Sequence, residues 1–146
     1  MALDLETRLR AVEDELAIRA LAARFGDCVN QRDFWGFAEL WSARAIWDIG
    51  PPMPGRAEGV DAIVAMLQRR LQLRLGLMPS PRFGVLHITG DTARVRLSGH
   101  RILIEDEMLR EACGRWRFAR RVCRHRYFET PGFADLTEWP ATIVQV

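Results

Sequence analysis

The spacing of apolar residues changes once along the chain, at Pro81, and this change limits the folds the chain can adopt. Before Pro81 the apolar residues recur mainly every three or four positions, which predicts amphipathic helices. From Arg82 they alternate, which predicts strands. Helices followed by a run of strands are typical of the α+β class. We therefore expect helices packed on one face of a curved antiparallel sheet.

The first half of the chain predicts three helices and one strand. A helix is expected over about residues 4–30, capped by Asp4, and a shorter helix after the cap residue Asp33. A strand at 45–49 ends at the cluster 51–55, and a third helix runs from Gly59 to the breakers near Gly76. The first helix presents one apolar face, made of Leu5, Leu9, Val12, Leu16, Ala20 and Ala23.

The second half predicts a meander of strands. Strands at 82–89 and 92–97 flank a turn at Gly90, and a further turn is expected at Ser98 and Gly99. Residues 100–112 and 115–127 then form one long hairpin around Cys113. With Ala112 opposite Arg115, the register pairs residues whose numbers sum to 227, such as Asp106 with Arg121. Because both faces of this hairpin mix polar and apolar residues, we expect a bulge within it.

Composition excludes several classes of protein. A chain of 146 residues fits a single domain, here residues 1–146 with a core at about 4–128 and a tail at 129–146 that folds back over the body. A net charge of +2 is too small to indicate nucleic-acid binding, and no apolar run is long enough to span a membrane. The N-terminus does not resemble a secretory signal, and the three cysteines lack zinc-site spacing. We therefore expect a cytoplasmic protein without metal or cofactor.

Several motifs together resemble the SnoaL-like branch of the nuclear transport factor 2 superfamily. They are A-I-x-x-L-x-x-R-F at 17–25, N-Q-R-D-F at 30–34, A-I-W-D at 45–48, G-D-T-A at 90–93 and G-R-W-R-F-A-R-R at 114–121. The resemblance implies a cone of three helices on a strongly curved sheet that encloses an apolar pocket. It also implies a homodimer or larger homo-oligomer and a small apolar or aromatic ligand. Relatives include polyketide cyclases, scytalone dehydratase and ketosteroid isomerase.

The resemblance also shows where this sequence departs from the usual catalytic pattern. Asn30 stands where the dehydratase and a related dehydrochlorinase carry a catalytic aspartate, and an amide does not accept a proton at neutral pH. The histidine that completes their dyad would fall near Pro79, so the usual Asp-His dyad is absent. Asp27, one helical turn before Asn30, is the remaining carboxylate of this segment. Its alternative role is a solvated side chain or a partner of Arg24.

The candidate site residues come from the helix end and from the hairpin. Arg121 matches the pocket arginine of the dehydrochlorinase, and alternation puts Cys123 and His125 on the same face of the strand. The candidate catalytic residues are Asp27, Arg121 and His125, and the candidate substrate-binding residues are Asn30, Trp47, His100, Asp106 and Cys123. Arg121 opposite Asp106 would either fix an anionic or enolate oxygen or form an ordinary cross-strand ion pair. A histidine near a sheet edge is often only hydrogen-bonded within the protein.

Two functional hypotheses follow. The first is a cofactor-independent pocket enzyme of secondary or aromatic metabolism, a cyclase, isomerase, dehydratase or hydrolase that uses general acid and base chemistry. In it Asp27 or His125 moves the proton and Arg121 stabilises negative charge. The alternative is a non-catalytic ligand-binding or assembly protein of the same fold. A third reading is a subunit of a multicomponent oxygenase.

Overall fold

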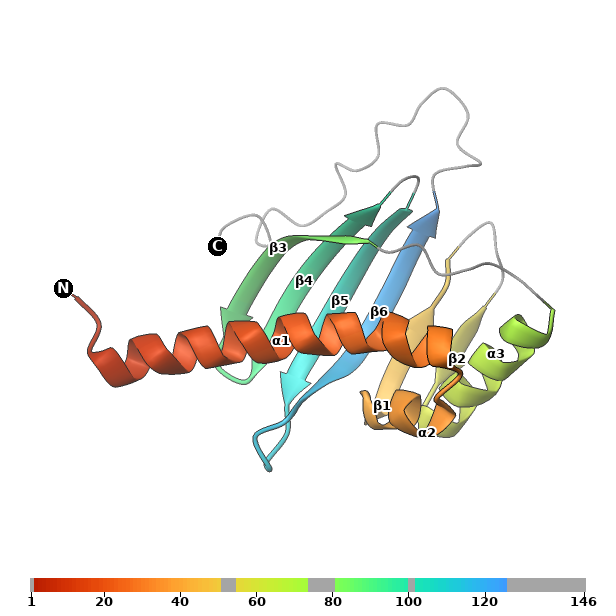
Figure 1. The fold of residues 1–146 in the computed structure, drawn as a ribbon, viewed down its shortest axis with the longest axis horizontal. Helices are drawn as coiled ribbons and strands as arrows, with labels where there is room; N and C mark the ends of the chain where they lie inside the picture. Colours follow the sequence, from red (N-terminus) through yellow and green to blue (C-terminus); the bar gives the residue numbers. More distant parts are fainter. Residues whose placement is uncertain (1, 51–54, 74–80, 100–101, 126–146) are drawn as a thin grey trace, which may run out of the picture.

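A six-stranded sheet, crossed on one face by a long helix, forms the body of the protein (Figure 1). The computed structural model describes residues 2–50, 55–73, 81–99 and 102–125. The sheet order is β2-β1-β6-β5-β4-β3. The helices are α1 (Leu5–Gln31), α2 (Phe34–Glu39) and α3 (Val60–Gln72), and the strands are β1 (Trp41–Asp48), β2 (Arg56–Glu58), β3 (Arg82–Thr89), β4 (Thr92–Gly99), β5 (Ile102–Arg110) and β6 (Trp116–His125). The predicted α+β class with helices on a curved sheet is confirmed.

Helix α1 packs on the sheet through a different face from the one predicted. Its buried residues are Asp14, Ile18, Leu21, Phe25, Cys28 and Val29. Leu5, Leu9, Val12 and Leu16 are instead more than half exposed. Leu16 and Ile18 show why, because side chains two residues apart on a helix point about 200° apart. The helix thus carries two apolar faces, and the more regular one in the sequence points away from the sheet.

The short elements that follow α1 bring the chain back to the sheet. Asp33 caps α2 as predicted, since its carboxylate accepts a hydrogen bond of 2.8 Å from the backbone N–H of Gly36. Strand β1 is longer than predicted because it begins at Trp41, and β2 was not predicted because it has only three residues. β1 lies parallel to β6 and antiparallel to β2, so it joins the two halves of the chain into one sheet.

The β5–β6 hairpin has the predicted register along most of its length and a bulge near its turn. Pairs from Ile102 with His125 to Glu107 with Arg120 match the prediction, and so does Asp106 with Arg121. After Glu107 the register shifts by one residue, so Met108 faces Phe118 rather than Ala119. The predicted pair of Ala112 with Arg115 is therefore wrong, because Glu111 lies opposite Arg115 and donates its backbone N–H to the Arg115 carbonyl oxygen. The bulge turns Phe118 inward on the same face as Arg121. The bulge therefore lets one face of β6 contribute both the apolar ring of Phe118 and the buried side chain of Arg121 to the core.

The rest of the strand prediction holds with one exception. The turn at Gly90 is confirmed, with β3 and β4 paired on either side of it. Ser98 and Gly99 do not form the predicted turn, because β4 continues through Gly99. His100, the end predicted for the third helix near Gly76 and the tail beyond residue 125 lie outside the described residues. None of the described helices is long and apolar enough to cross a membrane.

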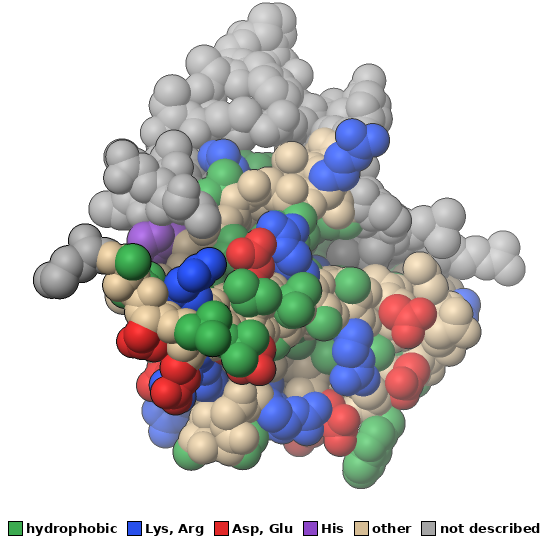
Figure 2. Space-filling view, turned by 60° about the vertical axis from the view of Figure 1, so that its left-hand side comes forward, with side chains coloured by type: hydrophobic (Ala, Val, Ile, Leu, Met, Phe, Trp, Pro, Cys, Tyr) green, Lys and Arg blue, Asp and Glu red, His purple; other side chains and the backbone are tan. Residues whose placement is uncertain are grey.

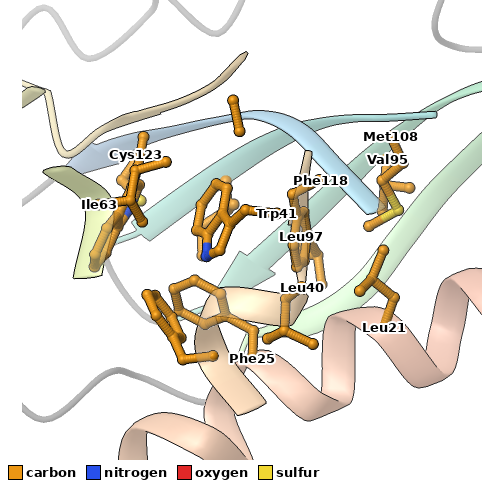
Figure 3. Close-up of a cluster of buried hydrophobic side chains, with 14 of the residues drawn as sticks. Leu21, Phe25, Leu40, Trp41, Ile63, Val95, Leu97, Met108, Phe118 and Cys123 are labelled. Carbon is orange, nitrogen blue, oxygen red and sulfur yellow. The ribbon is translucent and has the colours of Figure 1, made fainter. Parts of the chain in front are cut away.

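The core lies between the inner face of the sheet and the helices. In Figure 3, Leu21 and Phe25 of α1 face Trp41 and Phe118 of the sheet. The ring of Phe25 makes edge contacts with Trp41 and Phe118 at centroid distances of 6.0 and 5.9 Å. Such edge-to-face packing fixes the position of an aromatic ring more strictly than aliphatic contacts do. It holds the C-terminal half of α1 at a set height above β6.

Candidate functional site

A cavity of about 320 Å³ lies between the C-terminal half of α1 and the inner face of the sheet. This volume falls at the lower end of the range of small-molecule sites, which is about 300–1,000 Å³. The described residues that line it are Arg19, Ala22, Ala23, Phe25, Gly26, Asn30, Pro81, Phe83, Leu97 and Arg121. The cavity exists because α1 carries alanine and glycine where it passes the sheet. Larger side chains at those positions would fill it.

Arg121 is the buried polar side chain of this cavity. Its side chain is only 2% exposed, and it forms a bidentate ion pair with the fully buried side chain of Asp106. Nε and Nη2 of Arg121 each donate a hydrogen bond of 2.7 Å to the carboxylate. Nη1 makes no hydrogen bond to any part of the chain that the structure describes. Since Arg121 lines the cavity, its remaining N–H donors are available to a bound molecule.

Two aromatic rings fix the plane of the guanidinium. The Arg121 carbon Cζ lies 4.1 Å from the ring centroid of Phe25 and 4.7 Å from that of Phe118. Burial lowers the pKa of Arg121, but the carboxylate of Asp106 raises it to a larger total extent, so the arginine remains charged. Burial raises the pKa of Asp106, and the guanidinium acts in the opposite direction. Two hydrogen bonds of 2.7 Å are typical of a charged carboxylate and guanidinium.

Arg19 and Asn30 supply the other polar groups of the cavity wall. Arg19 is paired with Glu15 one turn earlier, at 2.8 Å, and both side chains are about half exposed. Its Cζ lies 4.3 Å from the ring centroid of Phe83 on β3. Asn30 is exposed at the end of α1. The polar groups of the described wall are therefore two arginines and one amide, and none of them exchanges a proton near neutral pH.

His125, Cys123 and Arg121 lie on one face of β6, as alternation predicted, but His125 and Cys123 are outside this cavity. Burial lowers the pKa of His125, and the guanidinium of Arg70 on α3 lowers it further. The imidazole is therefore neutral at pH 7. Burial raises the pKa of the Cys123 thiol to about 11, so this cysteine is not an activated nucleophile. Figure 3 shows Cys123 close to Ile63 of α3.

The remaining predicted residues are placed as follows. Asp27 is exposed and does not line the cavity, although it is one helical turn from Ala23 and Asn30, which do. Trp47 is buried in the aromatic core, with its ring centroid 5.6 Å from that of Phe25. His100 lies outside the described residues. The structure thus brings Arg121, Asp106 and Asn30 to or beside the cavity.

Arg19, Phe83 and Leu97 line the cavity but were not among the residues predicted from the sequence. Their signal was present but indirect. Arg19 begins a series of helix positions, 19, 22, 23, 26 and 30, which otherwise holds only small residues and one amide. A helix face that lacks bulk beside a sheet predicts open space there. Which strand residues border that space could be read only from the packing of α1 on the sheet.

Comparison with known proteins agrees with this fold. The SnoaL-like domain family matches residues 10–132. An NTF2-like protein with a cystatin-like fold from Novosphingobium aromaticivorans is 25% identical, with a TM-score of 0.71 over 86% of this chain and 90% of that one. A ketosteroid isomerase-like protein from Erwinia carotovora atroseptica is 17% identical, with a TM-score of 0.62 over 80% of this chain and 96% of that one.

A structure from Catenulispora acidiphila is 19% identical, with a TM-score of 0.65 over 80% of this chain and 94% of that one. A search of curated proteins finds no match to the chain. The match to the family covers most of the chain and includes α1 from residue 10 onward, the sheet and the cavity between them. The chain belongs to the SnoaL-like domain family, with the NTF2-like fold that its sequence predicted.

Proposed function

We propose that this protein is a cofactor-independent enzyme that binds a small, largely apolar or aromatic molecule in the cavity beside α1. The observation that carries the proposal is Arg121, a buried and charge-balanced arginine with free donors on an otherwise largely apolar wall. Family membership supports a small-molecule pocket of this kind. A ligand oxygen at Arg121 would receive charge-assisted hydrogen bonds in surroundings from which water is excluded.

The proposed role of Arg121 is to stabilise negative charge on a carbonyl oxygen as it becomes an enolate. Asp106 keeps the guanidinium oriented and makes the pair neutral overall, so the donors are held in place before the ligand arrives. Such preorganised donors favour a charged transition state over the ground state. This chemistry fits those isomerases, cyclases and dehydratases that remove a proton next to a carbonyl.

A proton acceptor must come from outside the described cavity wall. His125 is one candidate, because its lowered pKa leaves it neutral and able to accept a proton at pH 7. It lies four residues after Arg121 on the same face of β6, roughly 13 Å along the strand. Asp27 is the other candidate, because it is exposed near the end of α1, one helical turn from the cavity residues Ala23 and Asn30. The two candidates make different predictions for single variants.

Exchange of carbon-bound protons tests the proposal without knowledge of the natural substrate. The probe is 2-tetralone, a bicyclic ketone whose α-protons exchange with D₂O through an enolate, followed by NMR. We expect the protein to accelerate exchange over buffer. His125→Gln or Asp27→Asn should abolish the acceleration, depending on which residue is the base. His87→Gln, on the outward side of β3, is the matched control for His125.

A second candidate function is ligand binding without chemistry. It is favoured by one observation, that the polar residues of the described wall are Arg19, Asn30 and Arg121, none of which transfers protons near neutrality. Under this alternative, 2-tetralone would bind in a manner that depends on Arg121, and its exchange rate would equal that of buffer. Binding with exchange supports the enzyme, and binding without exchange supports the alternative.

A further inference from the structure

The first half of α1 exposes a row of large apolar side chains. Leu5, Leu9, Val12 and Leu16 have exposed fractions of 75%, 54%, 55% and 63%. Single exposed leucines are common in proteins, but four in a contiguous row are not. We call these four residues the outer stripe. It faces away from the sheet, because α1 packs on the sheet through Ile18, Leu21 and Phe25.

The outer stripe has the spacing of a coiled-coil seam. Its residues are separated by four, three and four positions, which assigns Leu9 and Leu16 to heptad position a, and Leu5 and Val12 to position d. In Figure 1 the N-terminal turns of α1 reach past the edge of the sheet. Figure 2, seen from the side on which α1 begins, shows hydrophobic side chains among acidic and basic ones. A helix that approached this end would meet little else of the protein.

The charges beside the outer stripe indicate what binds there. Position g holds Arg8 on one flank, and position e holds Glu13 on the other. Both are exposed, and neither forms an ion pair with any described residue. The neighbouring acids are already paired within the helix, Glu6 with Arg10 at 3.9 Å and Glu15 with Arg19 at 2.8 Å. One arginine and one glutamate, on opposite flanks, thus have no ion-pair partner within the part of the chain that the structure describes.

These two residues complement each other only between two copies of the helix. In a parallel, in-register pair, a g residue faces the e residue five positions later in the other helix. Arg8 of each copy then faces Glu13 of the other, which gives two ion pairs related by the twofold axis. In an antiparallel pair, residues of the same flank meet: Arg8 would face Glu15, which is already paired with Arg19, and Glu13 would face Glu6 with like charge. The charge pattern therefore selects the parallel arrangement.

We propose that the outer stripe binds the same stripe of a second copy of this chain, with the two α1 helices parallel and in register. The seam consists of Leu5, Leu9, Val12 and Leu16 from each copy, flanked by the two Arg8–Glu13 pairs. An anionic membrane fits this surface less well, because acids outnumber bases over residues 4–16, whereas membrane-binding helices are rich in lysine and arginine on the polar face. The proposal does not depend on the function of the cavity.

Sedimentation equilibrium over a micromolar dilution series tests the seam. The double variant Leu9→Glu/Leu16→Glu changes only exposed side chains, so its circular dichroism should match that of the parent. We expect its dimer dissociation constant to rise by more than about 100-fold. Leu73→Glu is the matched control, since Leu73, the C-cap residue directly after α3, is 62% exposed, and it should leave the constant unchanged. A monomeric parent chain, or a dimer that the double variant leaves intact, would overturn the proposal.

Charge reversal tests the parallel register. Arg8→Glu and Glu13→Arg should each weaken the dimer by roughly 3- to 30-fold, because each places like charges together at two symmetric sites. The double variant Arg8→Glu/Glu13→Arg should restore the parent constant. In an antiparallel pair, Glu13→Arg would strengthen the dimer by facing Glu6. Strengthening by Glu13→Arg, or failure of the double variant to recover, would therefore overturn the parallel arrangement.

Discussion

Removal of Arg121 alone should destabilise the protein far more than removal of the whole ion pair. In Arg121→Met the carboxylate of Asp106, which is 2% exposed as a residue, loses both of its 2.7 Å hydrogen bonds and its counter-charge. Breaking a buried pair in this way costs about 3–5 kcal/mol. For a chain of this length the melting temperature should fall by roughly 6–20 °C. Urea unfolding at pH 7, followed by tryptophan fluorescence, measures the loss.

The double variant Asp106→Leu/Arg121→Met separates the charge from the packing. It leaves no charge in the core, and replacing buried pairs by apolar residues is often neutral or stabilising. We expect it to recover most of the stability lost in the single variant. Arg94→Met, an exposed arginine on β4, is the control and should change the free energy of unfolding by less than about 0.5 kcal/mol.

The dependence on pH gives a further check of the same reasoning. Without Arg121, the buried carboxyl of Asp106 should have a pKa far above its unfolded value, so the folded variant retains a proton that the unfolded chain loses. The loss of stability should therefore be smaller at pH 4 than at pH 7. If Arg121→Met were as stable as the parent at pH 7, or if the double variant were no better than the single one, the account of a buried charged pair would be wrong.

Four other substitutions test separate parts of the structure. Asp14→Ala should lower the free energy of unfolding by roughly 1–3 kcal/mol, because it removes the carboxylate that accepts hydrogen bonds of 2.7 and 3.0 Å from Arg110. Urea unfolding measures this loss, and an unchanged midpoint would contradict the view that Asp14 anchors α1. Because the folded pKa of His125 is lowered, its contribution to stability is complete above pH 6.5 and is lost as pH falls; His125→Gln should flatten the stability profile below pH 6.5. Gly50→Ala should lower the free energy of unfolding by at least about 1–3 kcal/mol, since φ is +71° and the added methyl would collide with a carbonyl oxygen of β6. Gly90→Ala should lower it less, because Gly90 has φ +60° but open space around it.

Most of the fold could be predicted from the sequence because local signals and long-range pairing agree. The change of period at Pro81 separates helices from strands, and Asp33 marks the start of α2 with a side chain that the structure uses as a cap. The hairpin pairs run as predicted from Ile102 to Glu107, although the turn differs from the predicted one: Glu111 lies opposite Arg115, and the bulge after Glu107 offsets this difference of one residue. The bulge could be expected but not placed, because its position depends on how Phe118 packs against α1.

The buried face of α1 could not be predicted for a physical reason. The helix has two apolar faces, and period alone does not tell which one meets the sheet. Leu9 and Leu16 form the more regular row and point outward, whereas the buried face includes Asp14, which a search for apolar residues excludes. Asp14 can be buried because Arg110 and Trp116 donate hydrogen bonds to it. Those partners lie about a hundred residues away in the sequence.

The candidate site was predicted in part. Arg121 opposite Asp106 followed from the hairpin register, and the structure makes the pair bidentate and buried. Asn30 lines the cavity. Asp27 was selected because it is one turn from Asn30, but one turn leaves about 60° of rotation about the helix axis, and its side chain is exposed. The roles of Asp27 and His125 remain predictions that the exchange assay addresses.

The most direct test of the proposed cavity is a binding titration with 2-naphthol, a planar phenol whose oxygen resembles that of an enolate. The parent chain is compared with Asp106→Leu/Arg121→Met, which should stay folded, so any loss of affinity comes from the missing donors. One charge-assisted hydrogen bond predicts an affinity roughly 10- to 150-fold lower in the variant. Equal affinity in the two proteins would contradict the claim that Arg121 recognises a ligand oxygen in this cavity.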